Sequence, residues 1–133
     1  MSIASAKKPR ASSKITAGEL ARYFELKLAA EVGPHGVKHL LDSGENKAVI
    51  LDVRSREGYR AGHVPGAINI PLEDLKDRWQ ELPKAKQIVS YCWTATCTLC
   101  TKASQVLASK GYQAREMVGG IEAWKAAGFP VKG

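Results

Sequence analysis

The sequence predicts one α/β domain built on a parallel sheet with helices on both faces. Short apolar runs rich in β-branched residues alternate with helical segments at close spacing, which is typical of parallel sheets. The length of 133 residues suits a single domain with a real core. Hydrophobic residues make up 44% and charged residues 25%, an ordinary balance for a globular protein.

The N-terminus differs from the rest of the chain in charge. Its first fourteen residues carry Lys7, Lys8, Arg10 and Lys14 without any acid, and the whole chain has a net charge of +7. We expect residues 1–14 to form a disordered basic tail and residues 15–133 to form the domain. The tail has no aromatic side chain for base stacking, so no nucleic-acid partner is predicted.

Neither a membrane span nor a secretory signal is indicated. No apolar run approaches the roughly 20 residues that a membrane helix needs, and residues 1–14 lack the apolar stretch of a signal peptide. We therefore expect a cytoplasmic monomer without membrane contact. The cysteines number only three, an odd count that argues against a disulfide framework in such a chain.

The elements before the first strand are two helices. The first is predicted over residues 15–30, where Thr16 and Glu19 suit a capping box. One face of this helix is mostly apolar, through Leu20, Tyr23, Phe24, Lys27 and Leu28. Gly33-Pro34 interrupts it, and a second short helix follows over residues 37–41.

Strands and helices alternate in the remainder. Strands are predicted at residues 48–51, 67–70, 88–91 and 114–118. The run 48–51 is apolar throughout, as expected of a strand buried on both faces. Arg115 and Glu116 break the apolarity of the last strand, which predicts an edge position. Helices are predicted at residues 55–61, with Ser55 as N-cap, and at residues 72–79, 97–110 and 121–127.

Two segments should meet at one edge of this sheet, because sites in parallel sheets lie at the C-terminal strand ends. They are residues 52–54 and residues 92–98. Cys92 ends a strand just before a helix whose first N–H groups have no intrahelical partner. Those donors and the helix dipole favour a thiolate, which is the nucleophilic form of cysteine. The alternative is a small buried hydrophobic residue at a strand end.

Several motifs follow one another along the chain. They are Leu-Asp-Val-Arg at residues 51–54, Tyr-x-x-Gly-His-Val-Pro-Gly-Ala-Ile-Asn-Ile-Pro at 59–71, Tyr-Cys at 91–92, Gly-Gly-Ile-Glu-Ala-Trp at 119–124 and Gly-Phe-Pro at 128–130. In these motifs the chain resembles the rhodanese (sulfurtransferase) family over residues 15–131. The resemblance implies a single-domain rhodanese-like fold with a five-stranded parallel sheet. It implies that Cys92 takes up sulfane sulfur as a persulfide and passes it to a thiophilic acceptor, with thiosulfate and cyanide as the usual test substrates. It implies no metal and no organic cofactor.

The loop after Cys92 departs from the family pattern. The predicted substrate-binding residues are Trp93, Thr94, Ala95, Thr96, Cys97 and Thr98, and none is positively charged. Many family members carry an arginine where Cys97 stands, and arginine suits an oxyanion. A larger or protein-borne persulfide or thiol partner therefore becomes an alternative to a small donor such as thiosulfate. The related phosphatases carry an arginine where Thr98 stands, which argues against phosphate-ester hydrolysis.

Two other functions remain open from the residues. The domain could be a catalytically weak binding module, because the loop arginine is missing. It could also be a thiol redox sensor in which Cys97 resolves an oxidised Cys92. For Cys100 we favour a core position facing Ala103 and Val106. A zinc site is disfavoured because His35, His39 and His63 lie far from the cysteines in sequence.

Asp52 and Arg54 are predicted to support the edge of the sheet that carries the site. We interpret them as a structural pair that ties the strand end to neighbouring loops, in preference to a direct catalytic role. His63 lies between Gly62 and Val64 and is interpreted as a turn residue bonded to backbone, in preference to a general base.

Overall fold

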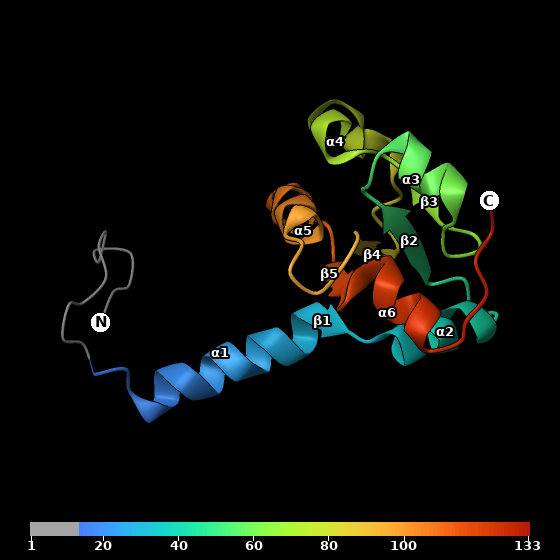
Figure 1. Cartoon of the computed structure of the whole chain (residues 1–133). Coiled ribbons are helices and arrows are strands. Elements are labelled where there is room, and N and C mark those ends of the chain that lie inside the picture. The colour runs from blue at the N-terminus through green and yellow to red at the C-terminus, as the bar shows by residue number, and fades with distance from the viewer. Residues whose placement is uncertain (1–13) are drawn as a thin grey trace.

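The computed structural model describes residues 14–133 as a five-stranded sheet with helices on both faces (Figure 1). The predicted disordered tail, apart from Lys14, lies outside the described residues. The strands are β1 Glu31–Val32, β2 Ala48–Asp52, β3 Ile68–Asn69, β4 Gln87–Tyr91 and β5 Ala114–Met117. The helices are α1 Ala17–Ala30, α2 Pro34–Asp42, α3 Arg56–Ala61, α4 Leu72–Arg78, the 3-10 turn η2 Trp79–Glu81, α5 Leu99–Ser109 and α6 Gly120–Ala126.

The strands pair in the order β1-β5-β4-β2-β3, and every pair is parallel. The predicted fold class is therefore confirmed. The prediction that residues 114–118 form an edge strand is wrong, because β1 pairs with β5 and takes the edge itself. The polar Arg115 fits inside the sheet because its guanidinium donates hydrogen bonds to the carbonyl oxygens of Ala29 and Glu31, both at 3.0 Å.

Each face of the sheet has its own apolar core. On one face, residues from β2 such as Leu51 pack with Leu75 of α4 and Leu107 of α5. On the other face, residues such as Ile50 pack with Val37 of α2 and Trp124 of α6. Successive strand residues point to opposite faces, so the side chains at the end of β4 point alternately into the two cores.

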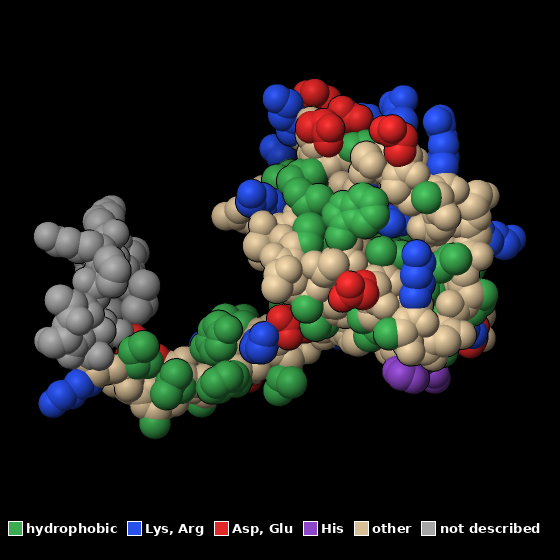
Figure 2. Space-filling view, viewed as in Figure 1, with side chains coloured by type: hydrophobic (Ala, Val, Ile, Leu, Met, Phe, Trp, Pro, Cys, Tyr) green, Lys and Arg blue, Asp and Glu red, His purple; other side chains and the backbone are tan. Residues whose placement is uncertain are grey.

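Helix α1 projects from the domain as a nearly free arm (Figure 1). Its predicted capping box is confirmed, since Thr16 Oγ1 accepts from the Glu19 N–H at 3.1 Å. None of its residues is buried, and its predicted apolar face stays exposed, with Leu28 79% accessible. Hydrophobic side chains follow one another along this arm (Figure 2).

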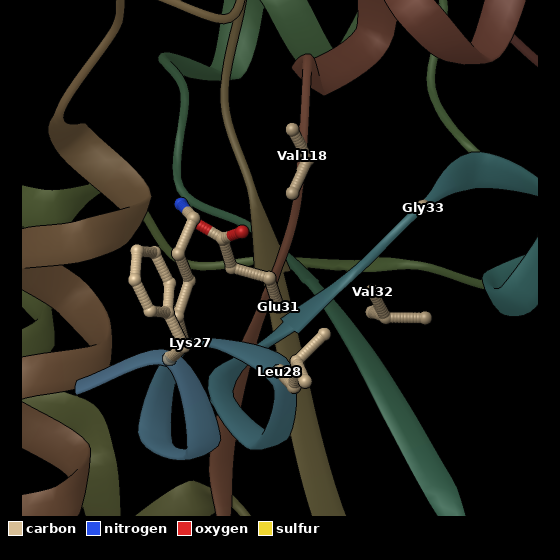
Figure 3. Close-up of a pocket in the computed structure, with 7 residues that line it drawn as sticks. Lys27, Leu28, Glu31, Val32, Gly33 and Val118 are labelled. Atoms are coloured by element: carbon tan, nitrogen blue, oxygen red, sulfur yellow. The ribbon is translucent and has the colours of Figure 1, made fainter. Parts of the chain in front are cut away.

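A hollow of about 400 Å³ lies where α1 joins the sheet (Figure 3). Lys27 and Glu31 form an ion pair of 2.9 Å there, beside Leu28, Val32 and Val118. No residue of the loop 92–98 lines it. Within residues 14–133, no helix is both long and apolar enough to cross a membrane.

Candidate active site

Cys92 follows β4 directly and points to the core that α4 and α5 cover. Its side chain is fully buried. Its Sγ lies 3.5 Å from the Sγ of Cys100, the second residue of α5, and 3.6 Å from the carbonyl oxygen of Cys97. A strand end and the first turn of a helix therefore place two sulfur atoms in contact.

The surroundings of Cys92 favour its thiolate. Hydrogen bonding from the Cys100 thiol lowers the pKa of Cys92 most, and contacts with the Cys97 side chain and with the backbone of Cys100 and Trp93 lower it further, against the opposing effect of burial. The same contact with Cys92, together with burial and the Glu116 carboxylate, raises the pKa of Cys100. The two pKa shifts have opposite directions, so within this pair ionisation is favoured at Cys92. The cause is hydrogen bonding, because no cationic side chain belongs to the loop 93–98.

The start of helix α6 binds two consecutive backbone carbonyl groups, those of Cys92 and Trp93. The N–H of Ile121 donates to the Cys92 carbonyl oxygen at 2.9 Å, and the N–H of Glu122 donates to that of Trp93 at 3.1 Å. Gly120 allows this approach, because a Cβ there would lie 2.6 Å from the Cys92 carbonyl oxygen. Its φ of +62° is also a conformation that favours glycine.

The rest of the loop is short and polar. The hydroxyls of Thr94 and Thr96 lie 3.2 Å apart, and the Cys97 N–H donates to the Thr94 carbonyl oxygen at 3.2 Å. This turn delays the helix, so α5 begins at Leu99 rather than at the predicted residue 97. Ala95 is exposed in the same loop, and Thr98 is the N-cap residue of α5 without a side-chain cap bond.

Trp93 links the loop to the end of β2. Its ring lies over the guanidinium of Arg54, 4.7 Å from Cζ to the ring centre, and packs against Gly58. The side chain is still 43% exposed. Trp93, Thr94 and Arg54 line a hollow of about 320 Å³ together with residues of α6, among them Glu122 and Lys125. This hollow is the surface depression next to the cysteine loop.

Asp52 and Arg54 form a buried ion pair at this edge of the sheet, with Arg54 Nη2 2.7 Å from Asp52 Oδ2. The same guanidinium nitrogen donates to the Gly62 carbonyl oxygen at 2.7 Å. Tyr91 donates its hydroxyl to Asp52 at 2.7 Å, and burial followed by the Asp52 charge raises the pKa of that phenol, so it stays a donor. The pair touches neighbouring loops and strands, and no contact joins it to Cys92 Sγ.

His63 lies outside the site. Its Nδ1 is 2.8 Å from the Tyr59 carbonyl oxygen, and the two rings stack at 3.7 Å. Among residues 14–133, no group of three or more His, Cys, Asp or Glu side chains is arranged to hold a metal ion.

The sequence interpretation of Cys100 missed its place beside Cys92. Cys100 does belong to the core with Ala103, as expected, but it also contacts Cys92 Sγ. Strand alternation was the signal available in the sequence, because it turns Cys92 away from Tyr91 and toward the face that α5 covers. Gly120 belongs to the motif at residues 119–124, but that motif alone does not indicate the contact with the loop backbone.

The structure is thus a parallel α/β domain with a buried cysteine of lowered pKa between a strand end and a helix. Residues 34–127 match the family model described as "Rhodanese-like domain", and the chain belongs to this family.

Several relatives carry names that describe a function. The chain is 40% identical over 90 residues to the HTH-type transcriptional regulator Rv0324 of Mycobacterium tuberculosis, a match covering 68% of this chain and 39% of the regulator. It is 35% identical over 103 residues to the human thiosulfate:glutathione sulfurtransferase, covering 66% of this chain and 86% of that protein. The crystal structure of BH2092 from Bacillus halodurans is similar with a TM-score of 0.81 and 33% identity, covering 89% of this chain and 87% of that one.

Proposed function

We propose that this protein is a sulfurtransferase that carries sulfane sulfur as a persulfide on Cys92. The observation that carries the proposal is the position of Cys92 Sγ just after β4, 3.5 Å from Cys100 Sγ, where hydrogen bonding lowers the pKa of Cys92. In the loading step, Cys92 Sγ attacks the outer sulfur of the donor, the donor S–S bond breaks and the donor leaves as an anion, which is sulfite when thiosulfate is the donor. A thiophilic acceptor then attacks the outer sulfur and releases the Cys92 thiolate.

The donor we favour is a persulfide, either small or borne on a protein, although thiosulfate remains a substrate. The thiolate is stabilised by thiols and backbone groups, and the loop 93–98 offers no cation to a doubly charged oxyanion. A low-molecular-weight thiol is the acceptor class suggested by the similarity to the thiosulfate:glutathione sulfurtransferase. The transfer needs no metal and no organic cofactor.

The hollow beside Trp93 suits this choice of partners. It opens next to the loop beside Trp93 and is lined by the basic residues Arg54 and Lys125. Glu122 adds a negative charge to the same lining. Because Cys92 itself is fully buried, the loop must move for a donor to reach Sγ. A partner that binds over Trp93 is well placed to displace the loop.

The test loads the protein with glutathione persulfide or with thiosulfate and measures the intact mass. Wild type should gain one sulfur, about 32 Da, on Cys92, and Cys92→Ser should gain none. Cys97→Arg should lower the KM for thiosulfate while leaving the KM for the persulfide unchanged, with Cys97→Gln as the uncharged control. If neither donor leaves sulfur on Cys92 in wild type or in Cys100→Ser, the protein is not a sulfur carrier and the binding-module alternative takes precedence.

A further inference from the structure

The contact between Cys92 and Cys100 has no role in simple sulfur transfer. A carrier needs one sulfur atom, yet this site holds two at 3.5 Å, both nearly inaccessible to solvent. Forming a disulfide of about 2.05 Å requires the two sulfur atoms to approach by only about 1.5 Å. The second residue of α5 is therefore positioned to react with whatever forms on Cys92.

A third group completes the arrangement. Cys100 Sγ lies 3.8 Å from Glu116 Oε1 of β5, and the Thr101 hydroxyl fixes that carboxylate through bonds of 3.0 and 3.2 Å. A carboxylate held in this way is a local acceptor for the Cys100 proton. The three groups come from the residue that follows β4, from α5 and from β5, and these elements are packed against one another.

We propose that Cys100 is a resolving residue that reduces the persulfide on Cys92 to sulfide when no acceptor is bound. The inference rests on the proposed function, since it starts from loaded Cys92. Glu116 takes the proton of Cys100, whose sulfur attacks Cys92 Sγ. A bond forms between the two cysteine sulfurs and the bond to the outer sulfur breaks. That sulfur takes up the proton released by Cys100 and leaves as hydrosulfide.

The step balances without an external oxidant. A persulfide and a thiol become a disulfide and hydrogen sulfide, so the outer sulfur gains two electrons and each cysteine sulfur loses one. An external dithiol then reduces the Cys92–Cys100 disulfide by thiol–disulfide exchange and restores both thiols. The overall activity is a dithiol-dependent reduction of sulfane sulfur, distinct from its transfer.

Loading itself prepares Cys100 for the attack. In the unloaded protein, the Cys92 thiolate is the main cause of the raised pKa of Cys100. In the persulfide, the negative charge lies on the outer sulfur, one bond further from Cys100. The pKa of Cys100 therefore falls once the substrate sulfur is bound to Cys92, and it stays raised while Cys92 is unloaded.

The experiment follows a single turnover of the full-length protein without acceptor and without oxygen. Wild type is loaded with glutathione persulfide, freed of excess donor, and followed by intact mass and sulfide release. We expect the added sulfur of about 32 Da to be replaced by a loss of about 2 Da relative to the reduced protein, with one sulfide released per chain. Peptide mapping should join Cys92 to Cys100.

Variants separate the two candidate partners of Cys92. Cys100→Ser should keep the added sulfur, whereas Cys97→Ser should still lose it and form the disulfide between Cys92 and Cys100. Glu116→Gln should slow sulfide release by about 100-fold, the lower end for loss of a general base. The map of wild type and of Cys97→Ser decides the question even where Cys100→Ser fails to fold.

Different contrary outcomes would overturn the role of Cys100 alone or the sulfur carrier as well. A stable persulfide on wild-type Cys92, or a disulfide between Cys92 and Cys97, overturns the role of Cys100 and leaves the sulfur carrier intact. The absence of added sulfur in wild type and in Cys100→Ser overturns the carrier and the resolving step together.

Discussion

Replacing Gly120 with alanine tests how α6 holds the reactive loop. The new Cβ would lie 2.6 Å from the Cys92 carbonyl oxygen and 2.7 and 2.8 Å from the Trp93 carbonyl carbon and oxygen. These are backbone atoms, which cannot rotate away as a side chain does. The loop and the start of α6 must therefore separate.

The expected cost has two parts. A residue with a Cβ at φ of +62° loses about 1–2 kcal/mol in the left-handed region. Separation also breaks the bonds from Ile121 to Cys92 and from Glu122 to Trp93, each worth about 1 kcal/mol. We expect Gly120→Ala to lower the free energy of unfolding by about 3–4 kcal/mol.

Gly66 provides the matched control. It has a φ of +85°, but a Cβ there meets nothing within 4 Å. Gly66→Ala should therefore lose only the conformational part, about 1–2 kcal/mol. Urea unfolding of both variants measures the difference, and equal losses would refute the contact argument. Because Cys92 is fully buried in the intact fold, a separated loop should also make it react faster with a small alkylating agent in Gly120→Ala than in Gly66→Ala.

Three further predictions concern ionisation, the ion pair and α1. Because the pKa of Cys92 is lowered, its thiolate absorbance should persist below the ordinary thiol pKa of about 8.5, and Cys100→Ala should move the midpoint upward, with Cys92→Ser as the blank. Asp52→Asn should lower the free energy of unfolding in urea by about 3–5 kcal/mol, because it leaves the buried Arg54 guanidinium without its carboxylate. Leu28→Gln should change it by less than about 0.5 kcal/mol, since this side chain is 79% exposed, and a larger loss would show that α1 packs on the domain.

The sequence was sufficient for the elements with strong local signals. The apolar run at β2, the capping box at Thr16 and the N-cap at Ser55 all depend on neighbours within a few residues, and the structure has them as predicted. The parallel sheet followed from the alternation of strands and helices. Such features are encoded locally, so a single sequence reveals them.

Contacts between residues far apart in the sequence could not be predicted from such local patterns. Strand β1 has only two residues, too few for any hydrophobic period, and its existence depends on β5 lying beside it. Arg115 looked like an edge residue because the carbonyl groups that satisfy its guanidinium come from residues more than eighty positions earlier. The contact of Cys92 with Cys100 likewise depends on where α5 packs.

Two of the motifs shared with the family, residues 51–54 and 119–124, support the loop at Cys92 and Trp93. The Asp52–Arg54 pair places a guanidinium beneath the Trp93 ring, and α6 binds the carbonyl groups of Cys92 and Trp93. Neither group touches the reactive sulfur. Their effect is to fix the strand end so that Cys92 Sγ stays against the first turn of α5, where its charge is stabilised without a cation. A loop supported from both sides in this way can lower the pKa of Cys92 without a cationic side chain, so the absence of positive charge from residues 93–98 bears on the proposed donor more than on the ionisation of Cys92.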